Sequence, residues 1–243
     1  MKNNILTIVT PAFERPKFLE RKLYHFSIQN CQNRIIIIDT SSEETLKKNE
    51  QTIKKYSKEL NLDHQQLPQK HHFIEKIFIA VNQSQTPYTV ISFDDDFLNL
   101  DNAFEGCKFL HEHEDYTSTT GYTLKLTKPK KETPSLSRVA IPGESDVYDD
   151  SDPLIRAQNF KNGSHNKNPL FNVWRTDILK ILLEPVAKSP WKKYSELLFD
   201  YAATISGKTK KLNDIFECRT VDYNKKEYRK KGDLEIENQC HRP

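Results

Sequence analysis

The sequence predicts an α/β fold in which a mostly parallel sheet packs between helices. Its first hundred residues alternate between short β-branched runs and longer segments with apolar residues at helical spacing. Such alternation requires helical crossovers between strands that run in the same direction. A length of 243 residues, with 13 Phe, 10 Tyr and 2 Trp, suffices for one large domain with its own core.

The first elements follow from local residue preferences. Residues 5–9 form an apolar strand, which we expect to end at Pro11. Residues 16–29 follow as a helix, with proline at its first position and an apolar stripe at helical spacing. Residues 34–38 are β-branched without polar alternation, which indicates a strand buried on both faces.

The alternation continues up to a run of three aspartates. Ser41 or Ser42 caps the next helix, which has glutamates in its first turn and lysines further along. Residues 72–83 are helical, and residues 88–93 form a strand that the aspartates follow directly. This order of elements indicates an α/β sandwich of the Rossmann type, with a further helix near 100–110.

The second half of the chain has a different character. Residues 125–168 are rich in Lys, Pro, Ser, Asn and Asp, which is typical of a surface loop or lid. Regular patterning resumes at 171–174, followed by expected helices at 177–183 and 194–206, the last closed by Gly207. The charged last twenty residues either pack as a terminal helix or begin a longer chain.

Composition excludes several classes of protein. The net charge of +3 is too small to indicate a nucleic-acid partner, and the longest apolar run, 77–81, is too short to span a membrane. No signal-peptide cleavage site follows the N-terminus, so we expect a cytoplasmic protein. The four cysteines show no metal-ligand or redox spacing, which fits a reducing compartment: Cys31, Cys107, Cys218 and Cys240.

The three aspartates are the first candidates for chemistry. In an extended segment Asp94 and Asp96 point to the same side, where both can face Mg²⁺ or Mn²⁺ that also binds a diphosphate. Ligands of open α/β sheets gather beyond the carboxyl ends of the strands, which is where this triplet lies. The alternative is an acidic turn that caps the helix near 100–110.

Two other strand ends bring polar groups to the same edge. After the first strand, Arg15 can meet a nucleotide and Phe13 can stack on a base. After the second strand, Asp39 can accept a hydrogen bond from a base N–H or a ribose hydroxyl. The alternatives are an ordinary turn with a solvated Arg15, and a helix cap at Asp39.

These segments resemble the motifs of a known enzyme family. Pro-Ala-Phe-Glu-Arg-Pro at 11–16 looks like the Pro-Thr-Tyr-Asn-Arg-Pro opening of GT-A glycosyltransferases. Asp-Thr-Ser-Ser at 39–42 is similar to their second-strand motif, and Phe-Asp-Asp-Asp at 93–96 to their Asp-X-Asp motif. Arg-Thr-Asp-Ile-Leu at 175–179 resembles a segment of the family-2-like bacterial and viral enzymes.

The resemblance covers about residues 6–116 and 174–211. It implies a GT-A Rossmann-like α/β/α sandwich forming one domain over 1–243, in which 1–116 bind a nucleotide sugar and an elaborated half, 117–243, binds the acceptor. It assigns residues to the donor, with Asp39 reading a base that is commonly uracil: Pro11, Phe13, Arg15, Asp39, Lys76, Asp94 and Asp95. Asp94 and Asp96 would hold Mn²⁺ or Mg²⁺, with His165 and His241 as candidates for a third ligand. For Lys76 the alternative is a solvated residue on a helix face.

The resemblance also points to a catalytic base. Inverting family members carry an acidic pair at the start of a helix that ends in Gly about eleven residues on, which places Glu196 at the base position. Ser195 replaces the usual preceding acid, and Asp200 is the second candidate, one turn further along. A first-turn carboxylate that answers the helix dipole is the alternative for Glu196. Arg156 is a further candidate for the diphosphate.

The resulting hypothesis is a metal-dependent glycosyltransferase, inverting in outcome. It would transfer a sugar from a nucleotide-diphosphate sugar, most commonly a UDP-sugar, to a hydroxyl of a glycan or lipid-linked saccharide. The basic clusters at 128–131 and 229–231 are solvated surface, or they steer an anionic donor or contact acidic lipid headgroups. The rival hypotheses are a nucleotidyltransferase acting on a sugar phosphate, and a non-catalytic sugar- or partner-binding module of the same fold.

Overall fold

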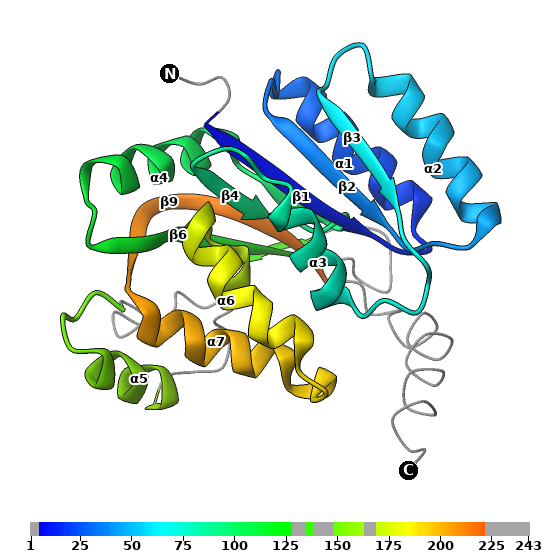
Figure 1. Ribbon diagram of the computed structural model, residues 1–243. Helices are drawn as coiled ribbons and strands as arrows, with labels where there is room; N and C mark the ends of the chain where they lie inside the picture. Colours follow the sequence, from blue (N-terminus) through cyan, green and yellow to red (C-terminus); the bar gives the residue numbers. More distant parts are fainter. Residues whose placement is uncertain (1–4, 128–134, 139–147, 163–168, 222–243) are drawn as a thin grey trace.

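The computed structural model describes residues 5–127, 135–138, 148–162 and 169–221. Within this part of the chain nine strands form a single sheet, in the order β3-β2-β1-β4-β8-β6-β9-β5, with β7 paired to β6 (Figure 1). Its first elements are β1 (Leu6–Ala12), α1 (Pro16–Ile28), β2 (Arg34–Asp39), α2 (Glu43–Tyr56), β3 (Leu62–Gln66), α3 (Phe73–Asn82), β4 (Tyr88–Ile91), β5 (Asp96–Leu98) and α4 (Leu100–Glu112).

The second half adds strands of both directions. β4 pairs antiparallel with β8, β6 pairs antiparallel with β8 and parallel with β9, and β5 pairs antiparallel with β9. The expected parallel sheet is therefore found in β3-β2-β1-β4, and the remainder is mixed. The elements are β6 (Tyr116–Thr127), β7 (Ser135–Arg138), α5 (Pro153–Asn162), the 3₁₀ turn η2 (Pro169–Phe171), β8 (Val173–Arg175), α6 (Thr176–Lys188), the 3₁₀ turn η3 (Lys192–Tyr194), α7 (Ser195–Ser206) and β9 (Lys208–Val221).

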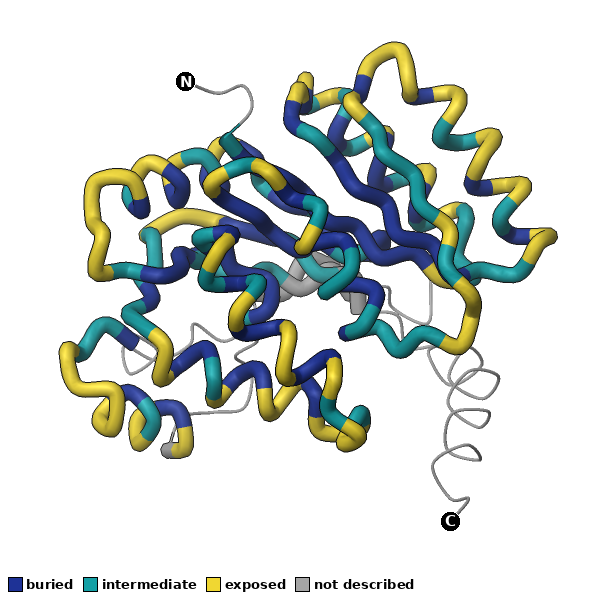
Figure 2. Tube along the Cα trace, in the orientation of Figure 1, coloured by how far each residue is buried: buried dark blue, intermediate teal, exposed yellow. Residues whose placement is uncertain are grey.

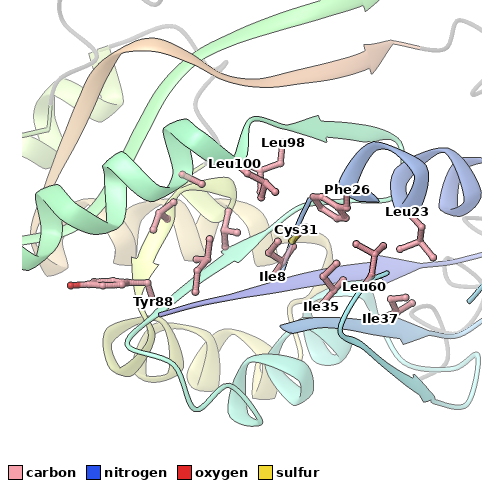
Figure 3. Close-up of a cluster of buried hydrophobic side chains, with 14 of the residues drawn as sticks. Ile8, Leu23, Phe26, Cys31, Ile35, Ile37, Leu60, Tyr88, Leu98 and Leu100 are labelled. Atoms are coloured by element: carbon pink, nitrogen blue, oxygen red, sulfur yellow. The ribbon is translucent and has the colours of Figure 1, made fainter. Parts of the chain in front are cut away.

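Alternation along the buried strands divides the core into two layers. Ile35 and Ile37 of β2 pack toward α1, in the cluster that Figure 3 shows with Leu23 and Phe26. Ile36 of β2 belongs to the opposite cluster, against α3, α6 and α7. The prediction that this strand is buried on both faces is confirmed, and Figure 2 shows the central strands as an almost continuous buried layer.

The first strand is longer than expected. β1 continues through Pro11, which lies opposite Ile38 of β2, so the expected end at Pro11 is wrong. Proline is tolerated here because the pairing with β4 ends at Val9, opposite Ile91. Beyond that point β1 pairs only with β2. The N–H that proline lacks would point to the other side, so no hydrogen bond of the sheet is lost.

The polar middle segment contains more regular structure than a loop. Residues 116–127 and 135–138 pair as β6 and β7, and 153–162 form α5. Arg156 of α5 is buried and donates to the carbonyl oxygens of Thr204 and Ile205 at the end of α7, and to those of Asp150 and Ser151. All three nitrogens of its guanidinium therefore bind backbone carbonyl oxygens and connect α5 to α7. Because none is left for a ligand, the prediction that Arg156 binds the diphosphate is wrong.

Gly207 is required by a close approach. Its φ of 175° is extended backbone, so α7 does not end in a left-handed cap. A Cβ at this position would lie 2.2 Å from the Thr117 side chain.

Within the described residues, no helix is both long enough and apolar enough to cross a bilayer.

Arg156→Leu should lower the free energy of unfolding by about 2–4 kcal/mol, because it removes charged hydrogen bonds to helix-terminal carbonyls. Urea denaturation followed by circular dichroism measures the change. Lys161→Leu, an exposed position of the same helix, is the control and should change it by less than about 0.5 kcal/mol. Equal effects of the two variants would show that the contact with α7 is unimportant.

Candidate active site

The three aspartates form a buried turn between β4 and β5. Asp94 and Asp95 lie in the turn, and Asp96 is the first residue of β5. The Asp94 side chain has no exposed surface. Burial raises the pKa of Asp94 to about 7, an effect that Arg15 opposes and Asp95 reinforces. Burial also raises the pKa of Asp96. Carboxylates so far from water need cations nearby.

Arg15 supplies one of these cations. It forms ion pairs with Asp94, through Nη2, and with Asp95, through Nη1 at 2.6 Å from Oδ2. The residue therefore lies at the expected edge of the sheet, but its fork holds two of the acidic side chains. A solvated Arg15, the alternative from the sequence, is wrong.

Lys22 is a second cation, which the sequence analysis missed. It lies on the inner face of α1, where its Nζ donates to the Asp96 carbonyl oxygen at 2.7 Å and to the Ser92 hydroxyl. The side chain is fully buried, and burial lowers the pKa of Lys22. The available signal was a lysine within the apolar stripe of the helix, between Leu19 and Phe26.

Lys76 of α3 approaches from the other side of the sheet. Its Nζ donates to the Ala12 carbonyl oxygen at 3.0 Å and to the Thr40 hydroxyl at 3.1 Å. The residue is 5% exposed, so the solvated alternative is wrong. Burial lowers the pKa of Lys76 to about 8, while Asp94 opposes the shift. Phe13 lies above it, with its ring centroid 5.7 Å from Nζ, and is 40% exposed.

Asp39 is buried at the end of β2. Oδ1 accepts a hydrogen bond from the Ser41 N–H at 2.9 Å, and Oδ2 accepts one from Asn49 at 2.7 Å, with His64 at 3.4 Å. These bonds outweigh burial and lower the pKa of Asp39. Its carboxylate is thus bound by Ser41, Asn49 and His64, and the sequence did not predict these partners.

The loop after β1 is fixed by an unusual residue. Glu14 has a φ of 53°, in the left-handed region that residues other than glycine rarely adopt. Ser42 occupies the N-cap position of α2, as expected, but its side chain makes no capping hydrogen bond. The Glu14 carboxylate instead accepts hydrogen bonds from the Ser42 N–H and the Thr45 hydroxyl at the start of this helix. This tie fixes the loop that carries Phe13 and Arg15.

One oxygen of the acidic turn has no hydrogen-bond partner among the described residues. It is Asp94 Oδ2, which is buried, and a buried charged oxygen normally has such a partner. Within the described residues no three acidic, His or Cys side chains converge on one point. His165 and His241 lie outside the described residues. These carboxylates therefore fit a hard cation that one or two of them bind together with oxygens of the substrate, as is common for Mg²⁺.

The two candidate bases lie one turn apart on α7. Spacing places Glu196 and Asp200 on the face that also carries Phe199, which packs on Trp174 with ring centroids 5.8 Å apart. Glu196 is nevertheless exposed, being in the first turn. Asp200 is buried, and its Oδ1 has no hydrogen-bond partner within 5–127, 135–138, 148–162 and 169–221. Burial, reinforced by Glu196, raises the pKa of Asp200 to about 7.

η2 links this helix to the acidic turn. It packs against α7, and its Phe171 contacts Phe93, the residue before Asp94, with ring centroids 5.0 Å apart. The structure therefore gathers the predicted donor residues at one sheet edge and connects α7 to that edge through aromatic contacts.

Comparison with known proteins identifies the fold. The sequence matches no protein-family model, and no curated protein has significant similarity to it. Among solved structures, residues 1–349 of Staphylococcus aureus TarS align over 96% of this chain at 18% identity, with a TM-score of 0.60. The same protein in complex with UDP-GlcNAc aligns over 90% at 17% identity, with a TM-score of 0.62.

A third solved structure is the Pyrobaculum calidifontis mannosyltransferase PcManGT in complex with GDP-Man and Mn²⁺, which aligns over 91% of the chain at 10% identity, with a TM-score of 0.58. The chain spans 65%, 59% and 58% of these three structures' own lengths. The expected architecture is confirmed: the chain has the GT-A fold of nucleotide-sugar glycosyltransferases.

Proposed function

We propose that the protein transfers a sugar from a nucleotide-diphosphate sugar, with UDP as the nucleotide, to a hydroxyl of a glycan or lipid-linked saccharide. The observation that carries the proposal is the buried acidic turn at the sheet edge, where Asp94 keeps an oxygen that no group in the described part of the chain binds, close to cations. The structural neighbours in complex with UDP-GlcNAc and GDP-Man support the donor class. Free thiols at Cys31 and Cys107 support a cytoplasmic location.

The donor would lie against the ends of β1, β2 and β4. Phe13 offers an exposed ring on which a base can stack, above the Lys76 ammonium. That ammonium has three donors, of which two are used by Ala12 and Thr40. Arg15 balances the carboxylates and shapes the turn. The Asp39 side chain has no exposed surface and already accepts hydrogen bonds from Ser41 and Asn49, so it would read the base only if the loop that covers it moves.

Asp94 and Asp96 would hold the divalent cation. Asp94 Oδ2 is the oxygen best placed to ligate it, because it is buried and accepts no hydrogen bond from any residue that the structure describes. Mn²⁺ or Mg²⁺, when bound, neutralises charge on the diphosphate and so lowers the barrier to its departure. The Mn²⁺ in the mannosyltransferase complex supports this assignment.

Glu196 would act as the base of an inverting transfer. It lies one turn before Asp200 on the same face of α7. Unlike Asp200, Glu196 is exposed, so an acceptor can reach it from solvent. As the acceptor oxygen bonds to the anomeric carbon, the bond to the diphosphate breaks and its electron pair leaves with that group. The acceptor proton passes to the Glu196 carboxylate.

A thermal-shift screen of nucleotides with and without Mn²⁺ tests the proposed function. At a 100-fold excess over Kd, UDP should raise the Tm by roughly 5 °C only when the metal is present. Asp94→Asn should abolish this metal-dependent shift, whereas Asp177→Asn, at an exposed position of α6, should retain it. Preference for a triphosphate would favour a nucleotidyltransferase, and no shift with any nucleotide would favour the binding module.

The pH dependence of donor binding should report on Lys76. With a pKa of about 8, its ammonium is present below pH 8 and is lost above it. The affinity for UDP, measured by calorimetry with Mg²⁺, should fall from pH 8 to 9.5, by up to about tenfold per pH unit. Lys76→Arg should remove this dependence, and Lys70→Arg, an exposed control, should keep it. A flat wild-type profile would refute the role of Lys76.

Glu196→Gln should keep the affinity for UDP but reduce turnover by about 10²–10⁴-fold, because the acceptor proton loses its carrier. Sugar transfer to a panel of hydroxyl acceptors measures the loss. Asp200→Asn should cost much less and serves as the matched control on the same helix face. An inactive Asp200→Asn beside an active Glu196→Gln would move the base by one turn, and two active variants would favour a mechanism without a dedicated base.

A further inference from the structure

The last described strand brings another cation to the acidic turn. β9 runs beside β6 (Figure 1). It also pairs antiparallel with β5, which places Arg219 directly opposite Asp96. Cross-strand partners of an antiparallel pair project to the same face of the sheet. Arg219 accordingly opposes the rise in the pKa of Asp96. The sequence predicted no strand here, and the resemblance placed this part of the chain in the acceptor-binding half, 117–243.

The Arg219 side chain is held on two sides. Its Nε donates to Glu217 Oε1 at 2.6 Å, and Glu217 is itself buried and accepts from the Thr123 hydroxyl at 3.1 Å. The guanidinium carbon lies 4.0 Å from the ring centroid of Phe171. Both contacts restrict the stem and the plane of the guanidinium, so the cation is fixed before any ligand arrives.

The outer end of this guanidinium remains free. Its two terminal nitrogens have no hydrogen-bond partner in the part of the chain that the structure describes, and the side chain is 28% exposed. Arg15 and Arg156 differ, because the terminal nitrogens of both are bound to protein oxygens. A planar guanidinium that is held at Nε and free at both terminal nitrogens is suited to bidentate binding of phosphate oxygens.

We propose that Arg219 binds the diphosphate of the donor and stabilises it as the leaving group. This inference rests on the proposed function. When the bond between the anomeric carbon and the diphosphate oxygen breaks, the electron pair stays on that oxygen, and the Arg219 fork donates to the phosphate oxygens over which the charge spreads. Glu217 and Phe171 act as positioning residues that aim the fork.

Calorimetric titration with UDP in the presence of Mn²⁺ tests the assignment, with GDP titrated in parallel. Arg219→Met should weaken UDP binding by about 10–100-fold, because a charged, fixed pair of donors is lost. Uridine binding, followed by saturation-transfer NMR, should be unchanged. Arg219→Lys keeps the charge beside Glu217 but not the fork, and should weaken UDP binding by several fold. Lys210→Met is the matched control, since Lys210 also lies on β9 and over an aromatic ring, that of Phe109.

The outcomes separate the two proposals. If Arg219→Met binds UDP within threefold of wild type, or if uridine and UDP binding fall together, Arg219 does not contact the diphosphate, although the proposed function stands. If Arg219→Met fails to fold, as judged by circular dichroism, the Arg219→Lys titration decides on the same criteria. If the wild type binds neither UDP nor GDP, the proposed function is wrong and this assignment falls with it.

Discussion

The fold depends on compensating the charges of three successive buried carboxylates, Asp94, Asp95 and Asp96. Isolated charges in a protein interior are costly, and neighbouring carboxylates repel each other as well. The structure meets this requirement with cations from four separate segments: Arg15 after β1, Lys22 on α1, Lys76 on α3 and Arg219 on β9. Each of these segments must reach the same sheet edge, so the charge balance of one turn constrains the positions of two helices, a loop and a strand.

The same constraint explains why the sheet changes direction. A purely parallel sheet would bring only strand ends and helix starts to the acidic turn. Here β5 leaves the turn and pairs with β9, which returns from the far half of the chain with Arg219 and Glu217. η2 adds Phe171 between Phe93 and Arg219. The second half of the chain thereby completes the site that the first half begins.

Local sequence patterns correctly predicted the strands and helices whose apolar residues follow a clear pattern. Ile35 to Ile38 could only be a strand buried on both faces, and Pro16 marked the start of α1. The edge strand Leu62–Gln66 escaped notice because its polar residues carry little periodicity, and β9 because its pairing partners lie far away in the sequence.

The sequence also located the candidate site, since strand ends converge in any open α/β sheet. The partners of each charge were beyond its reach. Arg15 and Asp94 are separated by 79 residues, and nothing local indicates that they pair. For the same reason Lys22 was hidden within an apolar stripe, and Arg156 looked like a ligand-binding residue when it binds helix carbonyls.

The distribution of the Lys22 contacts has a consequence for the order of folding. Lys22 lies 74 residues from Asp96, and Glu217 is further still along the chain. None of these charges can leave water favourably until the others arrive, so we expect α1, β5 and β9 to dock together at this edge. Contacts between such distant segments carry a large loop-closure cost and form slowly. The pairing of β1 with β2 is apolar from Ile8 to Pro11 except for Thr10, and we expect it to form earlier, with the acidic edge closing last.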